Sequence, residues 1–127
     1  MRILIVDDSE GIRLSVEDIV GHAGHSAVVA SNGREAWELL GQGEFDLIIS
    51  DNAMPERSGV ELLKMVRAGA RTTHIPFVLM SGDRVVSKDN PTSLEDVCAK
   101  FGATFLYKPF PLHALFSVLG VGVELCD

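Results

Sequence analysis

Short apolar segments recur along this chain and alternate with segments whose apolar residues are spaced three or four positions apart. Unbroken apolar runs of four to six residues are typical of strands buried on both faces, as in a parallel sheet. Ile3–Leu4–Ile5–Val6 is such a run, and it begins almost at the amino terminus. We expect strands at residues 3–6, 25–30, 45–50, 77–80 and 104–108.

The segments between these runs have helical spacing and carry helix-capping residues. Ser9 is a candidate N-cap for a first helix that ends at Gly21 or Gly24, and Ser93 and Gly102 bracket another. Strands that alternate with helices in this way predict an α/β domain with a parallel sheet and helices on both faces. We expect the later helices at 33–40, near 58–67, at 93–101 and at 111–119.

Length and composition favour a single folded domain. The 127 residues are 46% hydrophobic and 23% charged, close to the averages of globular proteins, and the chain is too short for two ordinary domains. We therefore expect one domain over 1–127, with a core at about 2–119 and a short tail at 120–127. The formal net charge of -7 argues against binding to nucleic acid or to anionic lipid through the overall field.

Neither of the two cysteines, Cys98 and Cys126, belongs to a metal-binding pattern, so both are expected to be free thiols. The amino terminus has no signal-peptide pattern, and no apolar stretch approaches the roughly 20 residues of a membrane span. We expect a cytoplasmic protein without a membrane-bound part.

Chemically active side chains follow four of the predicted strands. Parallel strands place their carboxyl ends along one crevice, where α/β folds bind ligands. The residues expected there are Asp7, Asp8, Asp51, Ser81 and Lys108. Each alone is most often a turn residue, a helix cap or a surface charge. Their coincidence at one edge indicates a site for a divalent cation and a phosphoryl group.

The residue types assign a role to each member of this group. Asp51 is a candidate nucleophile that forms an aspartyl phosphate. Mg²⁺ would relieve the repulsion between the carboxylates. Lys108 would contribute its ammonium, and Ser81 a hydroxyl donor, to the phosphoryl oxygens.

The pattern as a whole resembles the receiver domain of two-component response regulators, from about Arg2 to about Leu119. The resemblance rests on Asp7-Asp8, on Asp51-Asn52-Ala53-Met54-Pro55 followed by Gly59, on Ser81-Gly82 and on Lys108-Pro109-Phe110. It implies a flavodoxin-like (βα)5 fold of five parallel strands in the order 2-1-3-4-5.

The resemblance also implies a mechanism. Asp51 would accept a phosphoryl group from a phosphohistidine of a sensor histidine kinase or a phosphotransfer protein. Asp7, Asp8, Asp51 and the main-chain carbonyl of Ala53 would hold Mg²⁺, with Mn²⁺ as the alternative ion. Ser81 and Phe105 would act as the switch residues that alter the surface offered to a downstream protein. Such a domain catalyses only its own phosphorylation and autodephosphorylation, and we expect a monomer or a weak homodimer.

Three features depart from the family pattern. Ala53 and Gly82 are small residues that leave the phosphoryl site open. Phe105 stands where the family more often has Tyr, and the stretch from Ser81 to Lys108 is longer than usual, with the excess in residues 83–94. The longer segment adjoins a surface that family members use for partner binding and dimerisation, which puts the usual dimer in doubt.

Two other function classes remain open. A metal-dependent phosphatase can form an aspartyl phosphate, but such enzymes carry an acid two residues after the nucleophile, where this chain has Ala53. An interaction module that has lost phosphorylation usually lacks one of the acids or the lysine, and all of them are present here.

Overall fold

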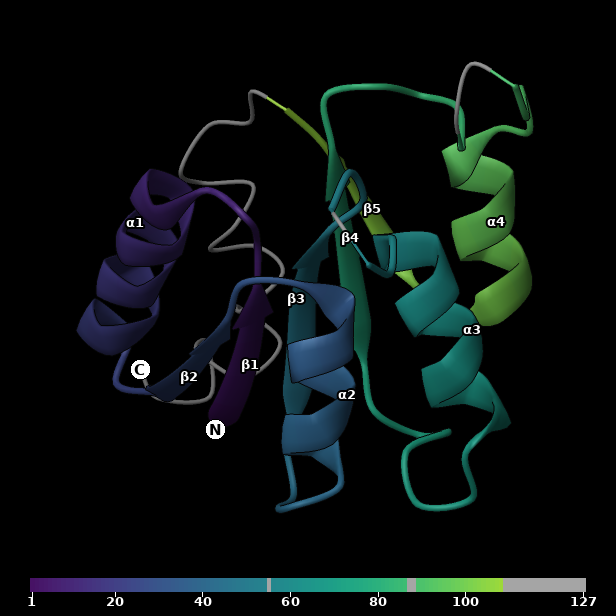
Figure 1. Ribbon diagram of the computed structural model, residues 1–127. Helices are drawn as coiled ribbons and strands as arrows, with labels where there is room; N and C mark the ends of the chain where they lie inside the picture. The colour runs from purple at the N-terminus through teal and green to yellow at the C-terminus, as the bar shows by residue number, and fades with distance from the viewer. Residues whose placement is uncertain (55, 87–88, 109–127) are drawn as a thin grey trace.

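The computed structural model describes residues 1–54, 56–86 and 89–108. Within them, strands and helices alternate along the chain (Figure 1). The elements are β1 (Arg2–Val6), α1 (Glu10–His22), β2 (Ser26–Ala30), α2 (Gly33–Leu40), β3 (Leu47–Asp51), α3 (Gly59–Ala68), β4 (Phe77–Ser81), α4 (Leu94–Phe101) and β5 (Thr104–Tyr107).

The strands form one parallel sheet in the order β2-β1-β3-β4-β5, which confirms the predicted order. The apolar strands β1, β3 and β4 lie in its centre, and β2 and β5 form its edges. Because all strands run in the same direction, their carboxyl ends gather at the upper edge of the sheet in Figure 1. The candidate residues follow or end these strands, so they gather there as well.

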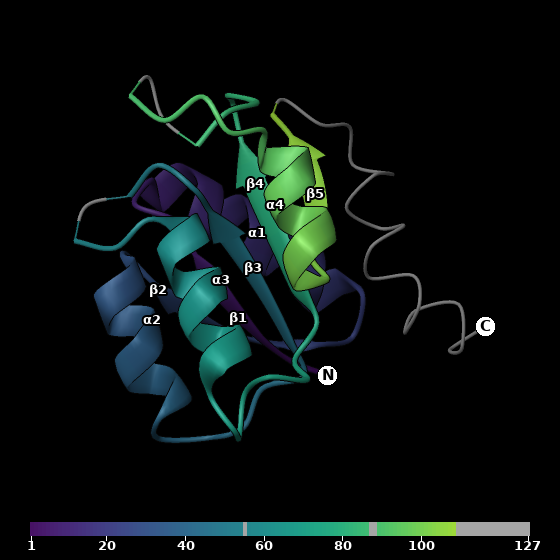
Figure 2. The ribbon, with the colours of Figure 1, turned by 90° about the vertical axis from the view of Figure 1, so that its right-hand side faces the viewer.

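The helices cover both faces of the sheet (Figure 2). Alternation along β1 divides its residues between two cores: Leu4 and Val6 pack with α2, α3 and α4, while Ile3 and Ile5 pack with α1. The same alternation in β3 and β4 explains why these strands are apolar at nearly every position. The expectation of helices on both faces is confirmed.

Polar side chains fix where the helices begin. The side chains of Ser9, Asn32, Ser58 and Ser93 each accept a hydrogen bond from a main-chain N–H in the first turn of their helix. At the other end of α4, Gly102 adopts a left-handed conformation with φ of 65°, a geometry that glycine adopts without strain. The caps at Ser9 and Ser93 and the stop at Gly102 agree with the sequence prediction.

Strand boundaries differ slightly from the prediction. β3 runs over Leu47–Asp51 where we expected residues 45–50. Phe45 extended the apolar pattern because it is buried, but it precedes the strand. Asp51 is consequently the last residue of β3, and the strand itself fixes its main chain.

The predicted helix at 111–119 lies outside the described residues, as do Pro109, Phe110 and Cys126. Cys98 is a buried free thiol, as expected. Burial, and to a smaller extent Glu95, raises the pKa of this thiol to about 11, which makes it unreactive at neutral pH. Among the described helices, none has the length and apolar character needed to cross a bilayer.

Candidate functional site

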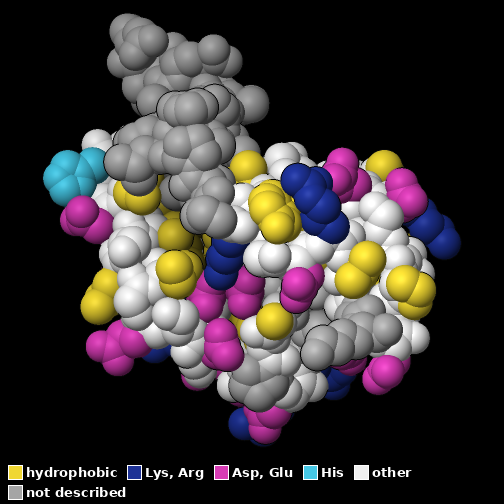
Figure 3. Space-filling model, turned by 90° about the horizontal axis from the view of Figure 1, so that it is seen from above, with side chains coloured by type: hydrophobic (Ala, Val, Ile, Leu, Met, Phe, Trp, Pro, Cys, Tyr) yellow, Lys and Arg dark blue, Asp and Glu magenta, His cyan; other side chains and the backbone are white. Residues whose placement is uncertain are grey.

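Three carboxylates converge at the carboxyl ends of β1 and β3. Asp7 and Asp8 follow β1, and each can offer a carboxylate oxygen within 4.8 Å of one from Asp51. Asp7 and Asp51 are buried and Asp8 is exposed, so the cluster opens to solvent on one side. Figure 3 views this face from above and shows several acidic side chains gathered beside a basic one near its centre. The sequence prediction that these carboxylates meet is confirmed.

Lys108 balances part of this negative charge. Its Nζ lies 3.1 Å from Oδ2 of Asp7 and 3.0 Å from Oδ1 of Asp51. Burial alone would lower the pKa of the Lys108 ammonium, but the bonds and charges of Asp51 and Asp7 outweigh it and raise the pKa. The main-chain N–H of Lys108 donates to the Ser81 carbonyl at 2.7 Å. Lys108 is therefore a fixed, fully charged cation between two carboxylates.

Asp51 is in a different electrostatic position. Burial raises its pKa, the hydrogen bond and charge of Lys108 lower it, the nearby Asp7 raises it, and the net shift is upward. One lysine thus only partly offsets the cost of an ionised Asp51 carboxylate. Functional groups in clefts often have a shifted pKa. The raised pKa of Asp51 means that its surroundings favour a change that removes or balances the charge of its carboxylate.

The main chain and a nearby arginine hold Asp7 in place. Its N–H donates to the Ala30 carbonyl at 3.1 Å, and its Oδ1 accepts from the Ser9 N–H at 2.9 Å. Arg13 reaches back from α1 and donates from Nη1 to the Asp7 carbonyl at 2.8 Å. The sequence reasoning missed Arg13, since nothing in the helical pattern marks which polar residue turns toward the strand.

Asn52 shapes the connection after Asp51. Its buried side chain accepts from the Val60 N–H through Oδ1 at 3.1 Å and donates from Nδ2 to the Val86 carbonyl at 3.3 Å. It therefore ties the start of α3 to the segment after β4. From the sequence, Asn52 stands out only as part of the segment Asp51-Asn52-Ala53-Met54-Pro55 and has no role of its own, although an amide directly after Asp51 at a strand end is an available signal.

Gly59 lets α3 approach Asp51. A Cβ at this position would lie 2.3 Å from the Asp51 carbonyl oxygen and 2.6 Å from Cδ1 of Leu79. Real Cβ atoms do not come so close, so any larger residue would push α3 away from the end of β3. Gly59 is thus needed for the position of Asp51.

The two switch candidates lie on neighbouring strands. Ser81 ends β4 and is 3% exposed, and its hydroxyl accepts from the Asp83 N–H at 3.0 Å. Phe105 lies on β5, where it is half-buried and packs against the core on the α2–α4 side of the sheet. Ala53 is exposed beside Asn52.

These residues fit a hard cation better than a soft one. Carboxylate oxygens in this number and spacing suit Mg²⁺, which binds one or two carboxylates and retains several waters. The open side of the cluster leaves room for those waters. No histidine or cysteine belongs to the cluster among the described residues, so the donors do not favour zinc.

Comparisons with known proteins agree with this geometry. Residues 3–119 match the model of the response regulator receiver domain. The chain is 37% identical over 83 residues to a chemotaxis protein CheY homologue of Campylobacter jejuni, and the match covers 64% of each protein. It is 37% identical over 109 residues to the two-component response regulator ORR5 of Oryza sativa, covering 84% of this chain and 77% of that one.

Solved structures show the same architecture. The chemotaxis response regulator CheY4 of Vibrio cholerae superposes with a TM-score of 0.80 at 32% identity, over 94% of this chain and 95% of that one. A response regulator receiver protein from Pseudomonas putida also gives a TM-score of 0.80, at 28% identity over 94% of each chain.

Proposed function

Because the chain belongs to the family of response regulator receiver domains, we propose that Asp51 accepts a phosphoryl group in a Mg²⁺-dependent reaction. The observation that supports this most directly is the grouping of Asp7, Asp8 and Asp51, with Lys108 bonded to two of the three. A nucleophile, a set of metal ligands and a cation for the phosphoryl oxygens are then within one small site.

The proposed reaction is an in-line displacement at phosphorus. A carboxylate oxygen of Asp51 attacks the phosphorus of a phosphohistidine, a P–O bond forms, and the P–N bond breaks with its electron pair returning to the imidazole nitrogen. Lys108 contacts the transferred oxygens, and the hydroxyl of Ser81 donates to them. The donor is a sensor histidine kinase or a phosphotransfer protein.

Asp7, Asp8, Asp51 and the Ala53 carbonyl are the groups that would hold the metal. When bound, Mg²⁺ supplies positive charge that offsets the charge of the phosphoryl oxygens. Asp7 is suited to this role because its main chain and Oδ1 are already fixed. Asp8 is exposed, so it would act from the solvent side.

Autodephosphorylation follows from the open site. Water attacks the phosphorus, the P–O bond to Asp51 breaks, and inorganic phosphate leaves while the carboxylate is regenerated. Ala53 and Gly82 are small and exposed, and a Cβ added at Gly82 would meet nothing within 4 Å. Water therefore has access, and the phosphorylated state should be short-lived; a lifetime of many hours would contradict this.

The output is a change of surface. Phosphorylation adds charge and acceptor oxygens at Asp51. Ser81 moves toward them, and Phe105 takes up the space that Ser81 leaves. The altered face, formed by α4, β5 and the predicted helix at 111–119, would bind a downstream protein. We propose that the domain acts in the cytoplasm, as a monomer or weak homodimer, without direct contact to nucleic acid.

Intact mass spectrometry tests the phosphorylation. The protein is incubated with acetyl phosphate, with and without Mg²⁺. We expect one added phosphoryl group with Mg²⁺ and none without it, and none in Asp51→Asn. Asp46→Asn is the matched control, since it removes an exposed carboxylate at the opposite end of the sheet. A gain that persists in Asp51→Asn would refute Asp51 as the acceptor.

A further inference from the structure

The long segment between β4 and α4 closes on itself at its base. Val85 and Ser93 form an antiparallel bridge, and the Val86 N–H donates to the Thr92 carbonyl at 2.9 Å. The Leu94 N–H donates to the Arg84 carbonyl at 2.8 Å. Because Leu94 is the first residue of α4, the main chain of Arg84 is bonded directly to the start of that helix.

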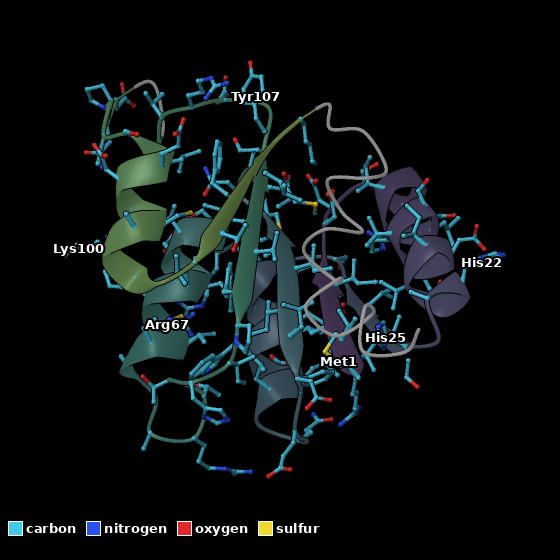
Figure 4. The ribbon with its side chains drawn as sticks, turned by 180° about the vertical axis from the view of Figure 1, so that it is seen from behind. Met1, His22, His25, Arg67, Lys100 and Tyr107 are labelled. Atoms are coloured by element: carbon cyan, nitrogen blue, oxygen red, sulfur yellow. The ribbon has the colours of Figure 1, made fainter. Side chains whose placement is uncertain are left out.

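The side chain of Arg84 contacts two further elements. Its guanidinium carbon lies 4.2 Å from the centre of the Tyr107 ring, at the end of β5, and its Nη1 lies 2.7 Å from Oε1 of Glu95 in the first turn of α4. Figure 4 shows Tyr107 at the carboxyl end of the sheet, beside this segment. Arg84 thus joins the segment after β4 to both β5 and α4.

These contacts lead directly to the candidate site. Tyr107 precedes Lys108, whose main-chain N–H is bonded to the Ser81 carbonyl. On the other side, Asp83 precedes Arg84, and its N–H is bonded to the Ser81 hydroxyl. A displacement of Ser81 therefore reaches Arg84 through Asp83. Arg84 in turn contacts β5 and α4, the two described elements of the proposed output face.

We propose that Arg84 is a positioning residue, and that its contacts with Tyr107 and Glu95, here called the Arg84 latch, hold the segment after Ser81 in its unphosphorylated arrangement. The proposal rests on the proposed function and adds to it a means of regulation. With the latch closed, movement of Ser81 toward a phosphoryl group is resisted. With the latch open, the phosphorylated arrangement is reached more easily, and α4 and β5 lose the link that Arg84 makes between them.

The exposure of the latch suits this role. Tyr107 is 41% exposed, and the side chains of Arg84 and Glu95 are 60% and 59% exposed. Exposed ion pairs and cation–π contacts are individually weak. Such a latch biases an equilibrium by about three- to tenfold rather than locking it, and a partner that takes hold of Arg84 or Tyr107 would shift that equilibrium.

Tyr107→Leu and Tyr107→Phe provide a matched test that leaves the charge unchanged. Leucine removes the aromatic face, whereas phenylalanine keeps it and loses only the hydroxyl. We expect the Kd for beryllofluoride, measured with Mg²⁺, to fall about three- to tenfold in Tyr107→Leu and to stay at the wild-type value in Tyr107→Phe. The rate of phosphorylation by acetyl phosphate should rise in Tyr107→Leu by a similar factor. Equal values in all three proteins would overturn the latch.

Arg84→Gln tests the other side of the contact. In a double-mutant cycle, Arg84→Gln and Tyr107→Leu together should tighten beryllofluoride binding no more than the larger single change, and fully multiplicative effects would overturn the coupling. Arg2→Ala is the control, because Arg2 stacks on Phe45 at 4.4 Å at the amino end of the sheet and should leave beryllofluoride binding unchanged.

Hydrogen exchange separates this proposal from the proposed function. Faster exchange of the Leu94 amide in Tyr107→Leu than in Tyr107→Phe is expected from the latch alone, with no phosphoryl group present. If wild-type protein neither gains a phosphoryl group nor binds beryllofluoride, the proposed function fails. In that case unchanged exchange at Leu94 also overturns the latch, whereas faster exchange supports it.

Discussion

Each end of the sheet contains a partly buried cation, but the two cations have different partners. At the amino end, the Arg67 guanidinium donates to main-chain carbonyls of the α3–β4 connection and of the end of α4, and Figure 4 shows it far from Tyr107. Its acceptors are Phe101 and Ile75, both at 2.6 Å, Thr73 at 3.1 Å and Gly102 at 3.2 Å. At the carboxyl end, Lys108 faces the carboxylates of Asp7 and Asp51.

The difference separates architecture from chemistry. Carbonyl oxygens have fixed positions and do not titrate, so Arg67 holds two connections together permanently. Carboxylates carry full charges and can bind another cation, so the arrangement around Lys108 can be exchanged. The same physical need, to satisfy a buried positive charge, produces a structural joint at one end and an adaptable site at the other.

The largest expected effect is at the amino end. Arg67→Met removes the donor from four main-chain carbonyls, two of which are partly buried, so we expect it to lower the free energy of unfolding by about 2–4 kcal/mol. Arg67→Lys keeps the charge but cannot reach all four acceptors. Its free energy of unfolding should lie between those of wild type and Arg67→Met. Urea denaturation measures both. A loss below 1 kcal/mol in Arg67→Met would contradict the structural role.

A smaller effect is expected at the carboxyl end. Without Mg²⁺, Lys108→Met leaves Asp7 and Asp51 without their shared cation and should cost about 1–3 kcal/mol of unfolding free energy. We expect a smaller loss than for Arg67 because Lys108 contacts two acceptors, whereas Arg67 donates to four. Urea denaturation in EDTA measures the cost, and a variant as stable as wild type would contradict the pairing.

The smallest effect is a pH dependence. The pKa of Asp51 is raised by folding, so the native state binds this proton more tightly, and the associated stability is present at acid pH and lost as pH rises through the folded pKa. Asp51→Asn removes this fall in stability with rising pH, because the asparagine amide does not titrate. Relative to wild type in EDTA, we expect the variant to gain stability between pH 4 and pH 7, and a difference that does not change with pH would contradict the raised pKa.

The sequence was sufficient to predict the sheet and the main members of the site. Apolar runs predicted all five strands, and the polar residues that follow them predicted the meeting of Asp7, Asp8, Asp51 and Lys108. Parallel strands bring their carboxyl ends together at one edge of the sheet, so a residue that directly follows a strand in the sequence is expected to lie in the crevice there.

The supporting contacts could not be predicted in the same way. Arg13 binds the Asp7 carbonyl, Asn52 links α3 to the segment after β4, and Arg84 stacks on Tyr107. Each contact depends on the direction of a side chain or on a partner far away in the sequence. The spacing of apolar residues gives no information on either. The structure shows that Asp7, Asp8, Asp51 and Lys108 lie together. The roles of these residues, like those of Ser81, Phe105 and the Ala53 carbonyl, remain predictions.

We infer that the carboxyl end of the sheet is an exchangeable cation site and that the amino end is not. The most direct test measures how much added Mg²⁺ raises the free energy of unfolding of wild type, Lys108→Met and Arg67→Met, starting from EDTA. We expect a larger gain in Lys108→Met than in wild type, because the carboxylates of Asp7 and Asp51 have lost their competing cation. In Arg67→Met we expect the same gain as in wild type. Equal gains in all three proteins, or no gain in any, would contradict it.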